Sequence, residues 1–156
     1  MTKPNNIIVM KAKDVKEFFL QWVWWLYPVH KLKEREIEVA AMYLYKRYEL
    51  LKIIPVVDPS KSEKEQQDAE ILRNKTLFST ETKQEIADEL GTTLGCIKVH
   101  TTALKKAGVV ISETREKGAI PDRLNPRFIP ALDYSDNTFR LQFYWKISDE
   151  QGNQED

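Results

Sequence analysis

The chain has 156 residues, of which 42% are hydrophobic and 31% charged, and these ordinary globular values exclude wholesale disorder. Its 24 basic residues balance 24 acidic ones, so the chain lacks the positive charge typical of nucleic-acid-binding proteins. The longest apolar run, residues 22–27, is far shorter than the roughly 20 residues of a membrane span, and the polar N-terminus has no signal-peptide core. We therefore expect a soluble protein without membrane insertion.

The charges are unevenly distributed along the chain. Residues 1–54 carry ten Lys or Arg against six Asp or Glu, whereas residues 148–156 carry four acidic side chains and no basic one. A basic front half and an acidic end can attract each other within one molecule or between neighbouring copies. A solvated tail is the simpler interpretation of the same pattern.

Two helices are predicted in the N-terminal region, residues 1–54. Asp14 and Glu17 have the spacing of a capping box at the start of a helix over about 15–25, which a proline at position 28 is expected to end. A second helix, over about 32–52, has apolar residues at helical spacing on one face. Residues 55–76 then form a linker or an exposed helix, because most of them are polar and show no apolar period.

The first helix carries aromatic residues on more than one stripe of its surface, so a core-facing side alone cannot hold them all. They form either the core of an unusually aromatic domain or an oligomer interface, where large aromatic side chains concentrate. The candidate interface residues are Phe18, Trp22, Trp24, Trp25 and Tyr27.

Residues 82–110 resemble a helix-turn-helix. Ile86 is spaced to pack a first helix, and Gly91 supplies the left-handed turn that ends it. Ile97 and Leu104 are spaced to pack a second helix across the first one. The residues that follow resemble the helix exit and first wing strand of winged-helix regulators.

A short apolar strand is expected over 109–111, followed by a loop rich in Pro, Asp and Arg. Residues 138–147 then alternate between apolar and polar side chains, which is typical of a half-buried strand. The expected fold is therefore α+β. It has an N-terminal helical pair, then a winged helix-turn-helix domain over residues 77–147 with an enlarged β wing, and finally an acidic tail over 148–156.

DNA binding is suggested by the second helix of this motif. Residues 93–107 contain three lysines and no acidic residue, which suits contact with phosphates. The outward positions lack the Arg, Asn and Gln side chains that bind base edges through two hydrogen bonds, and the first helix is acidic. The candidate DNA-binding residues are Lys98, Thr102, Lys105, Lys106, Arg115 and Lys117.

The sequence contains no catalytic arrangement: it has no glycine-rich phosphate loop, no nucleophile elbow and no paired-histidine metal helix. His30 and His100 are better explained as packing or surface residues than as general bases. Cys96 is the one cysteine and therefore forms no internal disulfide, and its position near a helix start lowers a thiol pKa without supplying a partner base. We expect no enzymatic activity, no cofactor, no metal site and no small-molecule substrate.

Three segments, LFSTETKQEIADELG (77–91), LKKAGVV (104–110) and LNPRFIP (124–130), are similar to small proteins of Bacteroidales bacteriophages, the crAss-like phages. This resemblance implies a phage origin and a place among the virion structural genes. We expect a non-enzymatic structural protein of a portal, neck or tail ring, located in the virion. It would dock through a winged-helix scaffold onto other phage structural proteins and copies of itself.

The alternative is a winged-helix DNA-binding transcription regulator of a phage, located in the host cytoplasm. The charge balance of the sequence slightly favours the structural role.

Overall fold

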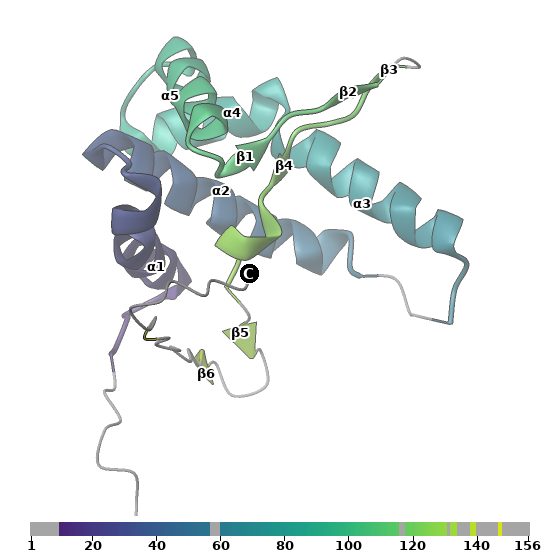
Figure 1. Cartoon of the computed structure of the whole chain (residues 1–156), viewed down its shortest axis with the longest axis horizontal. Helices are drawn as coiled ribbons and strands as arrows, with labels where there is room; N and C mark the ends of the chain where they lie inside the picture. The colour runs from purple at the N-terminus through teal and green to yellow at the C-terminus, as the bar shows by residue number, and fades with distance from the viewer. Residues whose placement is uncertain are drawn as a thin grey trace, which may run out of the picture.

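The structure, a computed structural model, describes residues 10–56, 60–115, 118–130, 132–133, 138–139 and 147 (Figure 1). Five α-helices make up most of this part of the chain: α1 (Val15–His30), α2 (Glu34–Ile53), α3 (Glu63–Leu77), α4 (Thr80–Leu90) and α5 (Leu94–Lys106). The shorter elements are β1 (Val110–Ile111), β2 (Thr114–Arg115), β3 (Gly118–Ala119), β4 (Arg123–Leu124), the 3₁₀ helix η1 (Pro126–Phe128), β5 (Leu132–Asp133) and β6 (Thr138–Phe139).

The expected α+β fold with an enlarged β wing is wrong. Within the described residues the chain is mostly helical, and its two-residue strands form only three separate antiparallel pairs, β1 with β4, β2 with β3 and β5 with β6. No winged-helix sheet forms in this part of the chain. Of the strand expected over residues 138–147, only β6 and residue 147 are described, and residues 140–146 lie outside the described part.

A register shift explains why the β structure stays narrow. Ile111 pairs with Arg123, and Thr114 pairs with Ala119, so two residues on one side oppose three on the other between these pairs. An unequal count of this kind interrupts the ladder. The longer side includes Pro121, which has no backbone N–H to donate to a neighbouring strand.

Local hydrogen bonds set the ends of α4 and α5. The Ser79 hydroxyl accepts a hydrogen bond from the Thr82 backbone N–H at 3.2 Å, and the Thr93 hydroxyl accepts one from the Cys96 N–H at 3.2 Å. Gly91, with φ of +65°, ends α4 in the left-handed conformation. The predictions of a left-handed turn at this glycine and of a second helix beginning just after it are confirmed.

The first helix is longer than predicted. Its start is confirmed, since the Asp14 carboxylate accepts a hydrogen bond from the Glu17 backbone N–H at 2.8 Å. The expected end at Pro28 is wrong, because α1 continues to His30. A proline in the last turn removes one backbone hydrogen bond but leaves the residues after it able to donate, so the helix can run on.

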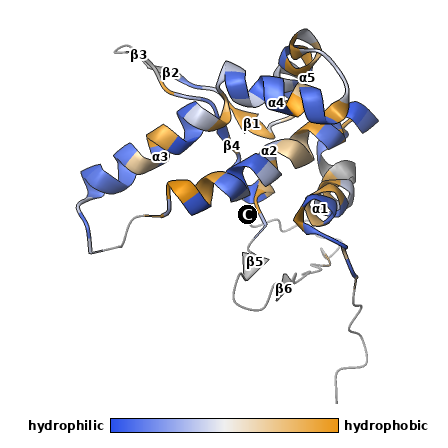
Figure 2. Ribbon diagram, turned by 180° about the vertical axis from the view of Figure 1, so that it is seen from behind, coloured by the Kyte–Doolittle hydropathy of each residue, from blue (hydrophilic) through white to orange (hydrophobic). Residues whose placement is uncertain are grey.

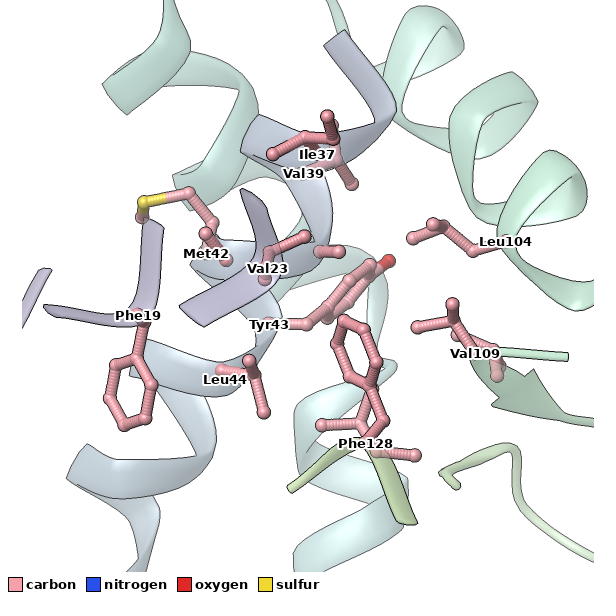
Figure 3. Packing of buried hydrophobic residues seen from close by; sticks show 14 of the residues in the cluster. Phe19, Val23, Ile37, Val39, Met42, Tyr43, Leu44, Leu104, Val109 and Phe128 are labelled. Atoms are coloured by element: carbon pink, nitrogen blue, oxygen red, sulfur yellow. The ribbon is translucent and has the colours of Figure 1, made fainter. Parts of the chain in front are cut away.

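The central element is α2, which contacts all four other helices. Its N-terminal half is buried and forms the middle of the core, where side chains from α1, α5 and η1 converge on it (Figure 3). Residues labelled there include Phe19, Val23, Tyr43, Leu104 and Phe128. The last turn of α2 and most of α3 extend away from this core, to the left in Figure 2, whereas Tyr45, Tyr48 and Leu77 still pack against it. We call residues 45–56 and 60–77 the arm.

Candidate functional site

The outward face of α5 carries the candidate DNA-binding residues of this helix. Lys98, Thr102, Lys105 and Lys106 are all exposed, opposite a buried face that holds Ile97, Thr101 and Leu104. Two of the expected contacts, Lys117 and the side chain of Arg115, lie outside the part of the chain that the structure describes.

A lysine from α4 joins this face. The pKa of Lys83 is lowered first by partial burial and then by the positive charges of Lys105 and Lys98, while Asp122 opposes the shift. The Asp122 carboxylate lies 3.0 Å from the Lys105 Nζ. Lys83 and Lys98, together with the ion pair of Lys105 and Asp122, form a cluster that we call the basic patch, and the sequence analysis did not select Lys83.

The acidic residues of α4 are less unfavourable for this patch than the sequence suggested. The Glu85 carboxylate lies 3.1 Å from the Lys46 Nζ of α2. Glu89 forms an ion pair with Lys16 of α1, and this hydrogen bond lowers the pKa of the Glu89 carboxyl. Two carboxylates of α4 are thus directed towards α1 and α2, where lysine side chains balance their negative charge.

The arm exposes apolar side chains that the sequence analysis did not select. Its helix α3 buries only Leu77. The exposed apolar residues of the arm are Ile53 (76% exposed), Val56 (71%), Ile71 (43%) and Leu72 (52%). The sequence signal was the apolar pair at 71–72 next to a polar stretch, but its exposure depends on how α3 packs on α2.

The aromatic residues of α1 divide between the core and the surface. Trp22 is buried, and its indole Nε1 donates a hydrogen bond to the Phe128 carbonyl at 2.7 Å. Phe18 is half-buried against the core, whereas Trp24 and Trp25 are 47% and 48% exposed. The side chain of Tyr27, the fifth residue of the candidate interface, lies outside the described part.

A cavity of about 210 Å³ lies between α2, α3 and the segment from β4 to Ile129. Among the described residues, Arg47, Arg73 and Arg123 line it together with one carboxylate, that of Glu70. A guanidinium N–H of Arg73 is within 3.3 Å of two backbone carbonyl oxygens, those of residues 54 and 55. Arg123 pairs with Glu113 at 3.1 Å. We call this site the arginine cavity.

The other reactive side chains do not converge on it. The His30 Nδ1 lies 3.2 Å from the Ala107 carbonyl oxygen, and its ring packs edge-on against Phe128. Cys96 is exposed, and hydrogen bonds with the hydroxyls of Thr92 and Thr93 lower its pKa. Among the described residues, no three His, Cys, Asp or Glu side chains are placed to hold a metal ion.

None of the helices in the described part of the chain has the length and apolar character needed to cross a membrane.

Comparison with known proteins finds no matching family model, no similar curated protein and no similar solved structure. The geometry of these surfaces is therefore the basis for a functional assignment.

Proposed function

We propose that this protein is a non-enzymatic structural protein of a bacteriophage virion, a component of the portal, neck or tail that works by docking onto other proteins and copies of itself. The observation that carries the proposal is the arm, which extends from the core and exposes Ile53, Val56, Ile71 and Leu72. Several large apolar side chains exposed on neighbouring helices are typical of a protein-docking surface.

The energy available from covering the arm is substantial. The exposed fractions of its four apolar residues amount to roughly 2.4 whole side chains. Burying one such side chain completely contributes about 1.5–3 kcal/mol, so a partner that covered all four would gain roughly 4–7 kcal/mol before the cost of association. Trp24 and Trp25 on α1 add a second surface rich in aromatic area.

The phage assignment rests on the resemblance of segments 77–91, 104–110 and 124–130 to proteins of crAss-like phages. Mass spectrometry of purified particles of the phage that encodes the chain tests it directly. We expect the protein in mature particles in several copies per virion. Its absence from particles, with abundant protein in the infected cell, would contradict a structural role.

The docking surface is tested by replacing Ile71 and Leu72 together with Gln, which keeps side-chain length and helix propensity but removes apolar area. We expect I71Q/L72Q to fold normally and to lose incorporation into particles by tenfold or more. The matched control is I71L/L72M, which conserves apolar volume and should assemble like the wild type. Equal incorporation of both variants would show that the arm is not the docking element.

A second candidate function, DNA binding through α5, is favoured by the basic patch. Lys83 and Lys98 come from the two helices of the α4–α5 pair, and Lys105 beside them pairs with Asp122, whereas the α4 residues Glu85 and Glu89 pair with lysines of other helices. This arrangement suits phosphate contacts and needs no wing.

A mobility shift with random duplex DNA over a salt series tests this candidate. If α5 binds DNA, Lys98→Ala should weaken binding and reduce the dependence on salt by about one ion. Lys75→Ala, an exposed lysine of α3, is the control. No binding at 50 mM salt, or equal binding by both variants, would rule out α5 as the recognition element.

A further inference from the structure

We propose that α3 binds α3 of a second copy in an antiparallel arrangement, so that two copies form a twofold dimer through their arms. The inference deepens the proposed docking role of the arm and rests on it, because it names the partner and the contact.

One stripe of α3 is exposed along the side that faces away from α2. On the opposite side, Ala69 and Arg73 are half-buried and Leu77 is buried. The exposed stripe follows helical spacing of four, three and four residues, and Leu72 lies beside it. Its members are Lys64, Asp68, Ile71 and Lys75. Figure 2 shows apolar residues in the middle of α3 and hydrophilic ones towards its start.

The order of charges along this stripe is complementary to itself when reversed. Asp68 lies three positions before Ile71, and Lys75 lies three positions after Leu72. A twofold axis between Ile71 and Leu72 would place Asp68 of one copy level with Lys75 of the other. Both residues would lie about 5 Å from the axis, because the helix rises about 1.5 Å per residue. Ile71 would then lie level with Leu72 of the other copy.

Both charged residues are available for such contacts. Asp68 and Lys75 are exposed, and among the residues that the structure describes neither forms an ion pair or a side-chain hydrogen bond. An exposed ion pair alone contributes little to binding, because water and salt screen it. The apolar centre, Ile71 and Leu72, would therefore supply most of the attraction, and the charges would set the direction and register of the two helices.

The charge order favours a second copy over the other candidate partners. A nucleic acid, or the acidic segment 148–156 of the same chain, carries one sign of charge. Such a partner would place negative groups against Asp68 wherever it reached both Lys64 and Lys75. An antiparallel α3 presents the opposite charge to Asp68 and to Lys75, and only a second copy supplies it.

The whole helix repeats the same order. Four of the five charged residues over 63–70 are acidic, and both charged residues over 71–77 are basic. This distribution also stabilises an isolated α3 through the helix dipole. The matched levels of Asp68 and Lys75 on the exposed stripe add nothing to the isolated helix, however, and are useful only in a pair.

The size of the contact predicts a weak dimer. Helix α3 has 15 residues and is about 22 Å long. One helix pair of this length covers less area than the roughly 1,200–2,000 Å² of a stable interface, so we expect a dimer that forms at micromolar and higher concentrations. A twofold contact uses the same surface on both copies and closes at two. It would supply a dimeric unit that joins a larger assembly through other surfaces.

The test is charge reversal on the full-length chain, measured by sedimentation velocity at low salt from micromolar to millimolar concentration. D68K places like charges against each other at both ends of the contact, and so does K75D. We expect each single variant to associate about tenfold more weakly than the wild type, since two attractive pairs become repulsive. The double variant D68K/K75D exchanges the charges within each pair and should associate like the wild type.

Mixing D68K with K75D at equal concentration should produce a heterodimer, because every charge on one copy then faces the opposite charge on the other. The matched controls are D88K on α4 and K106D on α5, which make the same changes of charge at exposed positions and should associate like the wild type. Positions 68 and 75 are also exposed, and the double variant shows whether the altered helix still folds.

Three results would overturn the inference: wild-type protein that stays monomeric up to millimolar concentration, single variants that associate like the wild type, or a mixture that forms no heterodimer. If I71Q/L72Q nevertheless lost incorporation into virions, the arm would bind a different virion protein and the structural role would stand. A dimer with the expected charge dependence, formed by a protein absent from virions, would contradict the structural role alone.

Discussion

Replacing Tyr43 with Phe and Thr101 with Val, singly and together, tests the buried hydrogen bond that joins α2 to α5. The Tyr43 hydroxyl lies 2.7 Å from the Thr101 Oγ1, and both residues are buried. The Thr101 hydroxyl donates to the Ile97 carbonyl at 2.8 Å, so its oxygen accepts the proton of Tyr43. Every donor in this short chain of hydrogen bonds therefore has an acceptor.

The two single variants differ in what they leave behind. Tyr43→Phe removes one donor and leaves the Thr101 hydroxyl bonded to Ile97, so we expect a loss of about 1 kcal/mol. Thr101→Val leaves the phenolic hydrogen buried without an acceptor, and we expect a loss of about 1–3 kcal/mol. The double variant leaves no unpaired polar group, so its cost should fall below the sum of the single costs by about 1 kcal/mol.

Urea unfolding measures these costs as changes in midpoint at constant slope. For a chain of this length, 1 kcal/mol corresponds to a shift of roughly 2–4 °C in Tm. Additive costs, or a Thr101→Val variant more stable than Tyr43→Phe, would refute the assigned direction of the hydrogen bond.

The burial of Tyr43 also predicts how the stability of the protein changes at alkaline pH. Burial raises the pKa of Tyr43 to about 12 from an ordinary value of 10.0. Between the unfolded and the folded pKa of Tyr43, the unfolded chain releases the phenolic proton and the folded chain retains it. The free energy of unfolding of the wild type therefore falls as pH rises, by up to about 1.4 kcal/mol per pH unit. Tyr43→Phe lacks this effect. The stability gap between wild type and Tyr43→Phe should therefore be constant from pH 7 to 9 and narrow above pH 10, and a constant gap up to pH 11 would contradict the burial of the phenol.

Three further predictions follow from local geometry. Gly91→Ala should cost about 1–2 kcal/mol and Gly91→Asn less, because φ is +65° there, and a neutral alanine in thermal unfolding would refute this. Trp22→Phe leaves the buried Phe128 carbonyl without its indole donor and should cost about 1–3 kcal/mol in urea, and a smaller loss than that of Tyr43→Phe would contradict it. Cys96 should react with iodoacetamide in the native protein with a pH midpoint below that of the urea-unfolded chain, because the Thr92 and Thr93 hydroxyls lower its pKa, and Thr92→Ala should raise that midpoint; an unchanged midpoint would exclude the threonine contact.

The helices were predictable where local signals suffice. A hydroxyl before α5, a glycine after α4 and apolar residues at helical spacing specify these two helices with few alternatives. The β structure was not predictable in the same way. Alternating side chains over 138–147 match a strand, but whether a strand joins a sheet depends on partners distant in the sequence, and the described ribbon is interrupted where Pro121 lies.

The functional surfaces were predictable only in part. Helical periodicity alone places Lys98, Thr102 and Lys105 on the outer face of α5. The addition of Lys83 and the pairing of α4 acids with α1 and α2 depend on how helices pack, which a single sequence does not reveal. The arginine cavity likewise joins residues from three separate elements, and no sequence motif predicts that these residues lie together.

The zero net charge of the chain does not by itself exclude binding to a charged partner. Charges act on a partner over about one Debye length, roughly 10 Å at 0.1 M salt, so a partner responds to the local patch rather than to the sum. This chain keeps a basic patch on α5 and an arginine cavity beside α3 while carrying its excess acid in residues 148–156. Pairing through α3 and DNA binding on the patch would both weaken with salt. Salt sensitivity alone therefore does not separate the two functions. The discriminating result is which substitution, that of Lys98 or that of Asp68, abolishes the salt-sensitive binding.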